Sequence, residues 1–116
     1  MATDDDVRRI ALSLPGGYEK ASHDGAPSFR TKPRMFVWIR DDPRAVVLFL
    51  ASEEEKHALI ADNPAVYFTT PHYDGYPIVL ARIEEIGVQE LTEMITESWR
   101  LRAPKRLVAE FDARTG

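Results

Sequence analysis

The alternation of apolar and polar positions predicts a helix near the N-terminus and a polar connection after it. Apolar residues recur from Val7 to Leu14 at the spacing of one helical face. Thr3 and Asp6 form a capping box in front of this stripe, and Pro15-Gly16-Gly17 ends it. Residues 18–28 have little periodicity, so we expect an irregular segment or a short edge strand there.

The next apolar segments favour a β-hairpin from about Phe29 to Ala51. SFRTKPRMFVWIR, residues 28–40, reads as its first strand, with Pro33 marking an edge or the strand's beginning because proline lacks an N–H donor. Strand alternation predicts two faces: Phe36 and Trp38 on one, and Met35, Val37 and Ile39 on the other. Asp41–Arg44 has turn chemistry, and AVVLFLA, residues 45–51, is the returning strand.

The following segments predict a second helix and a second hairpin. Ser52 and Glu55 form a capping box, and the helix that they open is expected to run to about Ala61. AVYFTT, residues 65–70, and IVLARI, residues 78–83, read as paired strands. Asp74-Gly75 is then predicted to be the tight turn between them, because this dipeptide suits a positive backbone φ.

Two helices are predicted at the C-terminal end. The first spans Val88 to about Arg102 after Gly87, and the second spans Pro104 to about Phe111. The buried stripe of the first is expected to contain Val88, Leu91, Ile95 and Trp99, with Met94 alongside. Leu107, Val108 and Phe111 are expected to dock the second helix. Trp99 is accordingly expected to lie in the core.

These elements predict one α+β domain over residues 1–116. Two antiparallel hairpins can join into one sheet, and its apolar face needs the helices as cover. We therefore expect a two-layer fold in which an antiparallel sheet of β-hairpins is covered by helices.

Composition limits the classes of function. The chain has 116 residues and no cysteine, which excludes disulfides, thiolate metal ligands and cysteine nucleophiles. No run reaches the roughly 18 apolar residues of a membrane span, and no secretory signal is recognised, so we expect a cytoplasmic protein without a membrane partner. The sequence leaves the oligomeric state open and favours a monomer.

The charged residues are segregated along the chain. The formal net charge is −4, which argues mildly against nucleic-acid binding. However, WRLRAPKR, residues 99–106, and FRTKPR, residues 29–34, hold basic residues and no acid. The acids gather at residues 4–6, 53–55 and 84–97. We expect a basic face and an acidic face, with solvated edges of the fold as the alternative.

The loop TTPHYDGYP, residues 69–77, is the candidate for chemistry. His72 and Asp74 could act as an acid–base pair, but two ligands are too few for a zinc site, so we expect no metal. No nucleophile elbow, phosphate loop or dinucleotide fingerprint is present, so we expect no cofactor and no catalytic residues. Trp38 is ambiguous: we favour a core position, but an exposed face would make it available to a base or a ligand.

Several motifs together resemble the MmcQ/YjbR-like family of small bacterial proteins. The motifs are LPGGYEK, FRTKPRMFVWI, PHYDGYPIVL and SWRLRAPKRLV, in this order along nearly the whole chain. The resemblance implies an α+β fold similar to the frataxin-like architecture, with a double-wing arrangement of hairpins. Members of the family are commonly labelled DNA-binding, and the resemblance supplies no catalytic residue.

Three functional hypotheses follow. The leading one is a non-enzymatic cytoplasmic protein that binds double-stranded DNA through a local basic surface. Its phosphate-binding residues would be Arg30, Lys32, Arg34, Arg100, Arg102, Lys105 and Arg106. The alternative is a small-molecule or protein interaction module. Its binding mouth would be formed by Trp38, His72, Tyr73 and Tyr76. The third and least favoured hypothesis is an enzyme that uses His72 and Asp74.

Overall fold

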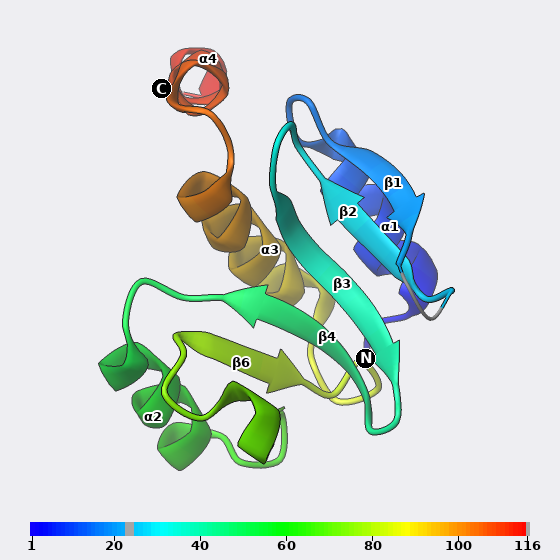
Figure 1. Cartoon of the computed structure of the whole chain (residues 1–116), viewed down its shortest axis with the longest axis vertical. Helices are drawn as coiled ribbons and strands as arrows, with labels where there is room; N and C mark the ends of the chain where they lie inside the picture. Colours follow the sequence, from blue (N-terminus) through cyan, green and yellow to red (C-terminus); the bar gives the residue numbers. More distant parts are fainter. Residues whose placement is uncertain (23–24, 116) are drawn as a thin grey trace.

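Helices cover one side of an antiparallel sheet in the computed structural model, which describes residues 1–22 and 25–115 (Figure 1). The elements are α1 (Asp4–Ser13), β1 (Tyr18–Ala21), β2 (Pro27–Arg30), β3 (Met35–Asp41), β4 (Arg44–Phe49), α2 (Glu53–Asp62), β5 (Tyr67–Phe68), the 3-10 helix η1 (Pro71–Tyr73), β6 (Ile78–Ala81), α3 (Val88–Arg102) and α4 (Lys105–Thr115). The strand order is β1-β2-β3-β4-β6-β5, and neighbouring strands are antiparallel. The expected α+β class is confirmed.

The N-terminal helix begins and ends as predicted. The Thr3 side chain accepts a hydrogen bond from the Asp6 N–H, and the Asp6 carboxylate accepts one from the Thr3 N–H, which completes the capping box. Beyond the helix, Gly16 has a φ of 72°, and a Cβ there would lie 2.6 Å from Cδ1 of Leu107. Glycine is therefore needed both for the turn and for the close approach of α4.

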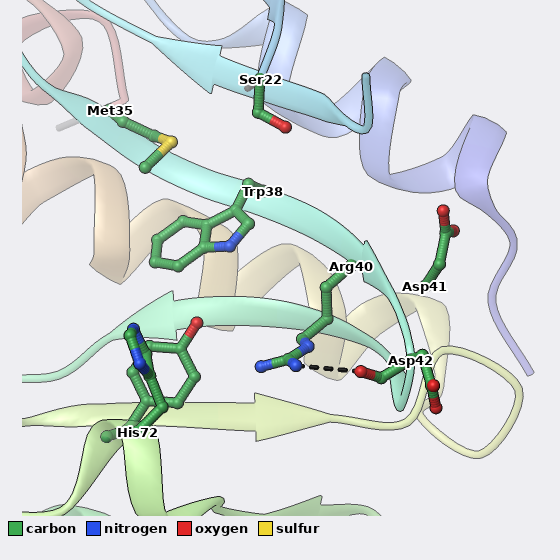
Figure 2. A pocket seen from close by; sticks show the side chains of 8 residues that line it. Ser22, Met35, Trp38, Arg40, Asp41, Asp42 and His72 are labelled. Atoms are coloured by element: carbon green, nitrogen blue, oxygen red, sulfur yellow. Dashed lines mark hydrogen bonds between the residues drawn. The ribbon is translucent and has the colours of Figure 1, made fainter. Parts of the chain in front are cut away.

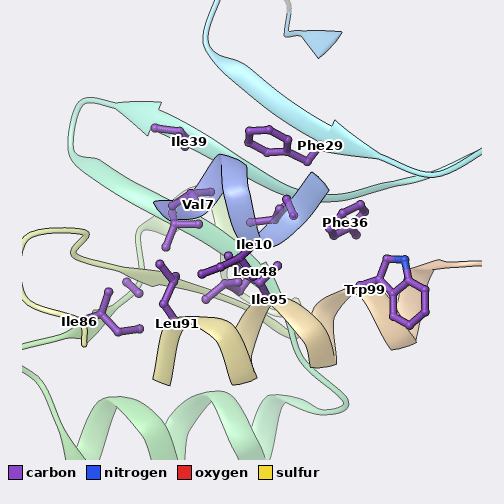
Figure 3. Close-up of a cluster of buried hydrophobic side chains, with 14 of the residues drawn as sticks. Val7, Ile10, Phe29, Phe36, Ile39, Leu48, Ile86, Leu91, Ile95 and Trp99 are labelled. Atoms are coloured by element: carbon purple, nitrogen blue, oxygen red, sulfur yellow. The ribbon is translucent and has the colours of Figure 1, made fainter. Parts of the chain in front are cut away.

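The main core lies between the sheet and helices α1 and α3 (Figure 3). Val7 and Ile10 of α1 contribute to it, as do Leu91, Ile95 and Trp99 of α3. Val88, which the sequence placed on the same stripe, is 37% exposed because it lies at the first position of α3. Leu107, Val108 and Phe111 of α4 pack against this core, as expected.

The structure of residues 28–40 differs from the single strand that the sequence predicted there. This segment forms two antiparallel strands, β2 and β3, instead of one. The chain reverses between them, where the Thr31 N–H donates to the Arg34 carbonyl at 2.9 Å. Pro33 lies inside this turn, since a residue without an N–H donor suits a turn better than a paired strand. The polar stretch before it contains the short edge strand β1, and residues 23 and 24 lie outside the described part of the chain.

An irregularity in the pairing of β3 with β2 changes which side chains of β3 lie on each face of the sheet. Phe29 pairs with Val37 but Arg30 pairs with Met35, so Phe36 is an extra residue opposite β2. Phe36 consequently lies in the helix-covered core with Val37, although the sequence pattern put it with Trp38. The buried Ser98 hydroxyl satisfies the backbone there: it donates to the Phe36 carbonyl and accepts from the Phe49 N–H.

The second hairpin exists, but its turn differs from the prediction. β5 pairs with β6 through only Tyr67–Ala81 and Phe68–Leu80. The connection includes η1, followed by a turn closed by the Tyr76 N–H and the Tyr73 carbonyl at 3.1 Å. Asp74 has an extended backbone and Gly75 has a φ of 82°, the conformations of a type II turn. Asp74-Gly75 therefore forms a turn within a longer loop.

A buried lysine holds this loop in place. Lys56 of α2 is 1% exposed, and its ammonium donates to the carbonyls of Tyr73 (2.7 Å) and Tyr76 (3.0 Å). At the start of α2, Ser52 accepts a hydrogen bond from the Glu55 N–H, which is one of the two bonds of the predicted capping box, and Asn63 caps the C-terminal end. Lys56 thus fixes where residues 73–76 lie over the sheet.

Removal of the Trp99 side chain should strongly destabilise the protein. Trp99 is fully buried, its ring packs against Phe111 at 5.2 Å, and its Nε1 donates to the Pro15 carbonyl at 3.1 Å. We expect Trp99→Ala to lower the free energy of unfolding by about 3–5 kcal/mol, measured by urea denaturation. Leu101→Ala, on the exposed side of the same helix, is the control and should change it little. Equal small effects of both changes would contradict the assigned core.

Replacement of Lys56 should loosen the loop after β5. Lys56→Met keeps an unbranched apolar stem but removes the charged donor that joins the Tyr73 and Tyr76 carbonyls to α2, at a cost of about 1.5–3 kcal/mol. Each carbonyl keeps one backbone donor, from the Tyr76 N–H and the Ile78 N–H. Hydrogen exchange in residues 69–77 should become faster than in the wild type. The exposed Lys105→Met is the control and should leave this exchange unchanged. Unaltered protection of the loop in Lys56→Met would show that other contacts hold it.

Candidate nucleic-acid and ligand surfaces

The sheet face opposite α1 and α3 contains an open hollow. Its volume is about 730 Å³. It is lined by Ser22, Met35, Trp38, Arg40, Asp41, Asp42, His72 and Tyr73. Figure 2 shows the Trp38 indole on β3 between Met35 and Arg40, with His72 on the loop across the hollow. The loop after β5 and strand β3 thus form two walls of one open groove.

Three aromatic side chains lie in a row along this groove. The ring of Trp38 lies 5.7 Å from that of Phe49 and 6.4 Å from that of Tyr73. Both rings are tilted against the indole, by 58° and 52°, so neither stacks flat on it. Tyr73 is buried over the small apolar cluster of Ala45, Val47 and Leu80, whereas Trp38 is half-buried at its margin. We call Phe49, Trp38 and Tyr73 the aromatic row.

The predicted binding mouth is assembled only in part. Trp38, His72 and Tyr73 line the hollow, and the His72 ring meets the Tyr73 ring edge-on at 4.8 Å. Tyr76 is 58% exposed and is not among the residues that line it. Within residues 1–22 and 25–115, no hydrogen bond joins the side chains of His72 and Asp74.

An arginine flanks each end of the aromatic row. The guanidinium of Arg102 lies 4.1 Å from the centre of the Phe49 ring, and that of Arg40 lies 6.0 Å from the centre of the Tyr73 ring. Arg40 also donates to the Asp42 carbonyl at 2.9 Å. These two positions place positive charge at both ends of an otherwise apolar floor.

Most of the predicted phosphate-binding residues gather at one end of the molecule. Thr31, which precedes Lys32, and Leu107, which follows Arg106, both approach Gly16. The Nε of Arg102 donates to the Met35 carbonyl at 3.0 Å, beside Arg34. Figure 1 shows the β2–β3 connection and the start of α4 at the same end. We define the basic end as Arg30, Lys32, Arg34, Arg102, Lys105 and Arg106.

The cations of the basic end lack acidic partners. None of the six forms an ion pair within residues 1–22 and 25–115. Burial, and then the nearby charge of Arg34, lower the pKa of Arg102. Six cations without an acidic partner make the basic end a candidate site for phosphate groups.

Arg100, unlike the six residues of the basic end, has an acidic partner. Its guanidinium forms an ion pair with Asp112 at 2.7 Å and lies over the Phe111 ring at 5.3 Å. The hydrogen bond to Arg100 lowers the pKa of Asp112 and raises that of Arg100. Arg100 therefore joins α3 to α4, a contact between two helices that the sequence pattern did not reveal.

Several residues of the groove and of the aromatic row were missed by sequence reasoning, among them Arg40, Phe49 and Met35. Arg40 lies two positions after Trp38, so strand alternation could have placed both on one face. By the same alternation, Phe49 could have been placed on the same face of the sheet as Val47, which lies two positions before it on β4. Met35 could not have been found, because the extra residue at Phe36 moves it to the face opposite the one that its spacing predicts.

The described ranges contain neither a candidate metal cluster nor a candidate membrane-spanning helix. No group of three or more histidine, aspartate or glutamate side chains is placed to hold a metal ion there. Among those same residues, no helix is sufficiently long and apolar to cross a membrane.

Known proteins resemble this chain in sequence and in structure. Uncharacterised proteins of Mycobacterium tuberculosis and Mycobacterium bovis are each 43% identical over 133 aligned positions, which cover 100% of both chains. The crystal structure of a Deinococcus radiodurans protein with a DUF419 domain matches with a TM-score of 0.74 and 23% identity, over 87% of this chain and 78% of that one. The YjbR family model matches residues 12–101, so the chain belongs to the YjbR family.

Proposed function

We propose that this protein is a non-enzymatic, cytoplasmic DNA-binding protein that contacts phosphates through the basic end. The proposal rests on two basic segments that are far apart in the sequence and lie close together in the structure. The β2–β3 turn supplies Lys32 and Arg34, and the α3–α4 junction supplies Arg102, Lys105 and Arg106. A cluster assembled from separate segments and without acidic partners is a typical footprint for a polyanion.

Local charge can support binding although the whole chain is acidic. Other arginines are neutralised by neighbours, such as Arg8 by Glu19 and Arg44 by Asp4 and Glu84. The cations of the basic end have no such neighbours within the described ranges, so the local potential there is positive. Each phosphate that they neutralise releases counterions, which is the main source of sequence-independent affinity for DNA.

A small-molecule or protein partner in the groove is the second candidate. The observation that favours it is the convergence of Trp38, His72 and Tyr73 on one hollow of about 730 Å³, a volume in the range of small-ligand sites. Under this alternative, the basic end would be an ordinary solvated surface.

Paired charge removal at the basic end should weaken DNA binding. We expect a salt slope of about −3 to −4 on duplex DNA if four phosphates are contacted. Lys32→Gln/Arg34→Gln and Lys105→Gln/Arg106→Gln should each reduce the magnitude of that slope by about 2. Fluorescence anisotropy with a labelled duplex at several salt concentrations measures both quantities. Arg102 is left intact because its hydrogen bond to Met35 supports the fold.

Arg9→Gln/Arg114→Gln is the matched control. It removes the same charge from two exposed arginines that are not part of the basic end and that pair with Asp6 and Glu110. We expect its binding to remain near that of the wild type. Equal losses in all three double variants would indicate a response to net charge alone and reject this surface. A wild-type protein that does not bind duplex or single-stranded DNA at low salt would disprove the DNA hypothesis.

A further inference from the structure

The groove and the basic end are parts of one continuous surface. A second hollow, of about 480 Å³, is lined by Arg30 of the basic end and shares Ser22 and Met35 with the main hollow. Arg102 extends the same connection, because it belongs to the basic end and also lies over the Phe49 ring of the aromatic row. A chain bound at the basic end can therefore continue along β3 without crossing a helix.

This surface combines the two features that an unpaired nucleic-acid strand requires. The first is a line of cations for the backbone, from Arg30 and Arg102 to Arg40 at the far end of the aromatic row. The second is Trp38, a half-buried indole that lines the hollow and has no ring stacked flat against it. Aromatic side chains in basic grooves bind unpaired bases by stacking, with little dependence on sequence.

Duplex DNA would use this groove poorly. Its bases are stacked and paired inside the helix, so their flat faces cannot reach a side chain on the floor of a sheet. Asp41 and Asp42 lie at the end of the groove near Arg40 and would repel the second phosphate backbone of a duplex. A single strand can avoid them by placing its phosphates along the basic side and its bases on the aromatic row.

We propose that the uncovered sheet face is a binding groove for single-stranded DNA, in which a base stacks on Trp38 while Arg30, Arg40 and Arg102 contact the backbone. This inference rests on the proposed DNA-binding function and makes it more specific, because it names the unpaired strand as the preferred form. It also gives Trp38 a role as a stacking surface, separate from the phosphate contacts of the basic end.

The first test uses the wild-type protein and strands that differ only in their bases. A labelled oligothymidylate of about eight nucleotides is compared with an abasic strand of the same length and with a duplex. We expect the oligothymidylate to bind more tightly than the duplex and to quench tryptophan fluorescence, because Trp99 is fully buried and Trp38 is the accessible indole. The abasic strand has the same phosphates, so its affinity should fall about 5- to 150-fold if stacking contributes.

The second test compares two substitutions of aromatic residues by leucine. Trp38→Leu should weaken oligothymidylate binding about 5- to 150-fold and leave duplex binding by the basic end unchanged. Tyr76→Leu is the matched control, since Tyr76 is an exposed aromatic residue of the loop after β5 and lies outside the hollow. Its affinity for both forms of DNA should remain that of the wild type. Thermal unfolding of both variants checks that they are folded, and the abasic comparison remains decisive if Trp38→Leu is not.

The outcomes separate this inference from the proposed function. Duplex binding that equals or exceeds single-strand binding would overturn the groove and leave DNA binding by the basic end in place. Equal affinity for the abasic strand, or a folded Trp38→Leu protein with wild-type affinity, would overturn the groove in the same way. Absence of binding to every strand would overturn both proposals. Tighter binding of an RNA strand of matching sequence would reject DNA as the occupant.

Discussion

One buried hydroxyl group determines how the sheet presents its two faces. Ser98 on α3 donates to the Phe36 carbonyl and accepts from the Phe49 N–H, so it joins the helix to both β3 and β4 at the irregularity. One helical turn later, Arg102 donates to the Met35 carbonyl. A buried polar group without these partners would cost about 1–3 kcal/mol. The helix therefore stabilises the shift that buries Phe36 and leaves Met35 and Trp38 on the uncovered face.

The two faces of the sheet have different roles. The covered face packs against α1 and α3, where Trp99 and its neighbours are fully buried. The other face is only partly covered, by the loop that contains Tyr73, and Lys56 determines how far that cover extends. The groove lies between Trp38 on β3 and His72 and Tyr73 on this loop. Packing on one face thus supplies the stability that lets the opposite face keep an open surface.

The functional proposals depend on this chain's own residues. The Deinococcus structure supports the fold alone, and the names of the mycobacterial relatives state no function. What this chain adds is the arrangement of Arg102, which is hydrogen-bonded to β3, close to Arg34 and placed over Phe49. This residue connects the basic end to the aromatic row, so phosphate contacts and base contacts can belong to one surface.

Local patterns in the sequence predicted most of the elements. The capping box at Thr3, the buried positions Leu91, Ile95 and Trp99, and the break at Ala103-Pro104 follow from helical spacing and cap chemistry, which act within a few residues. The α+β class followed from the order of those elements. The separate strands β2 and β3 were missed, because the pattern did not distinguish a turn around Pro33 from the start of a strand.

Only the tertiary structure decided which side chains come together in the groove and at the basic end. Spacing could not place Met35 with Trp38, because the extra residue at Phe36 is stabilised by Ser98, which lies far along the chain. Nor could it separate Arg100 from its basic neighbours, since that residue pairs with Asp112 on a helix whose position depends on packing. The sequence by itself determined the elements and the kinds of side chain available for binding. Contacts between distant segments decided which of those side chains meet, because hydrogen bonds and ion pairs depend on distance in space and not on separation along the chain.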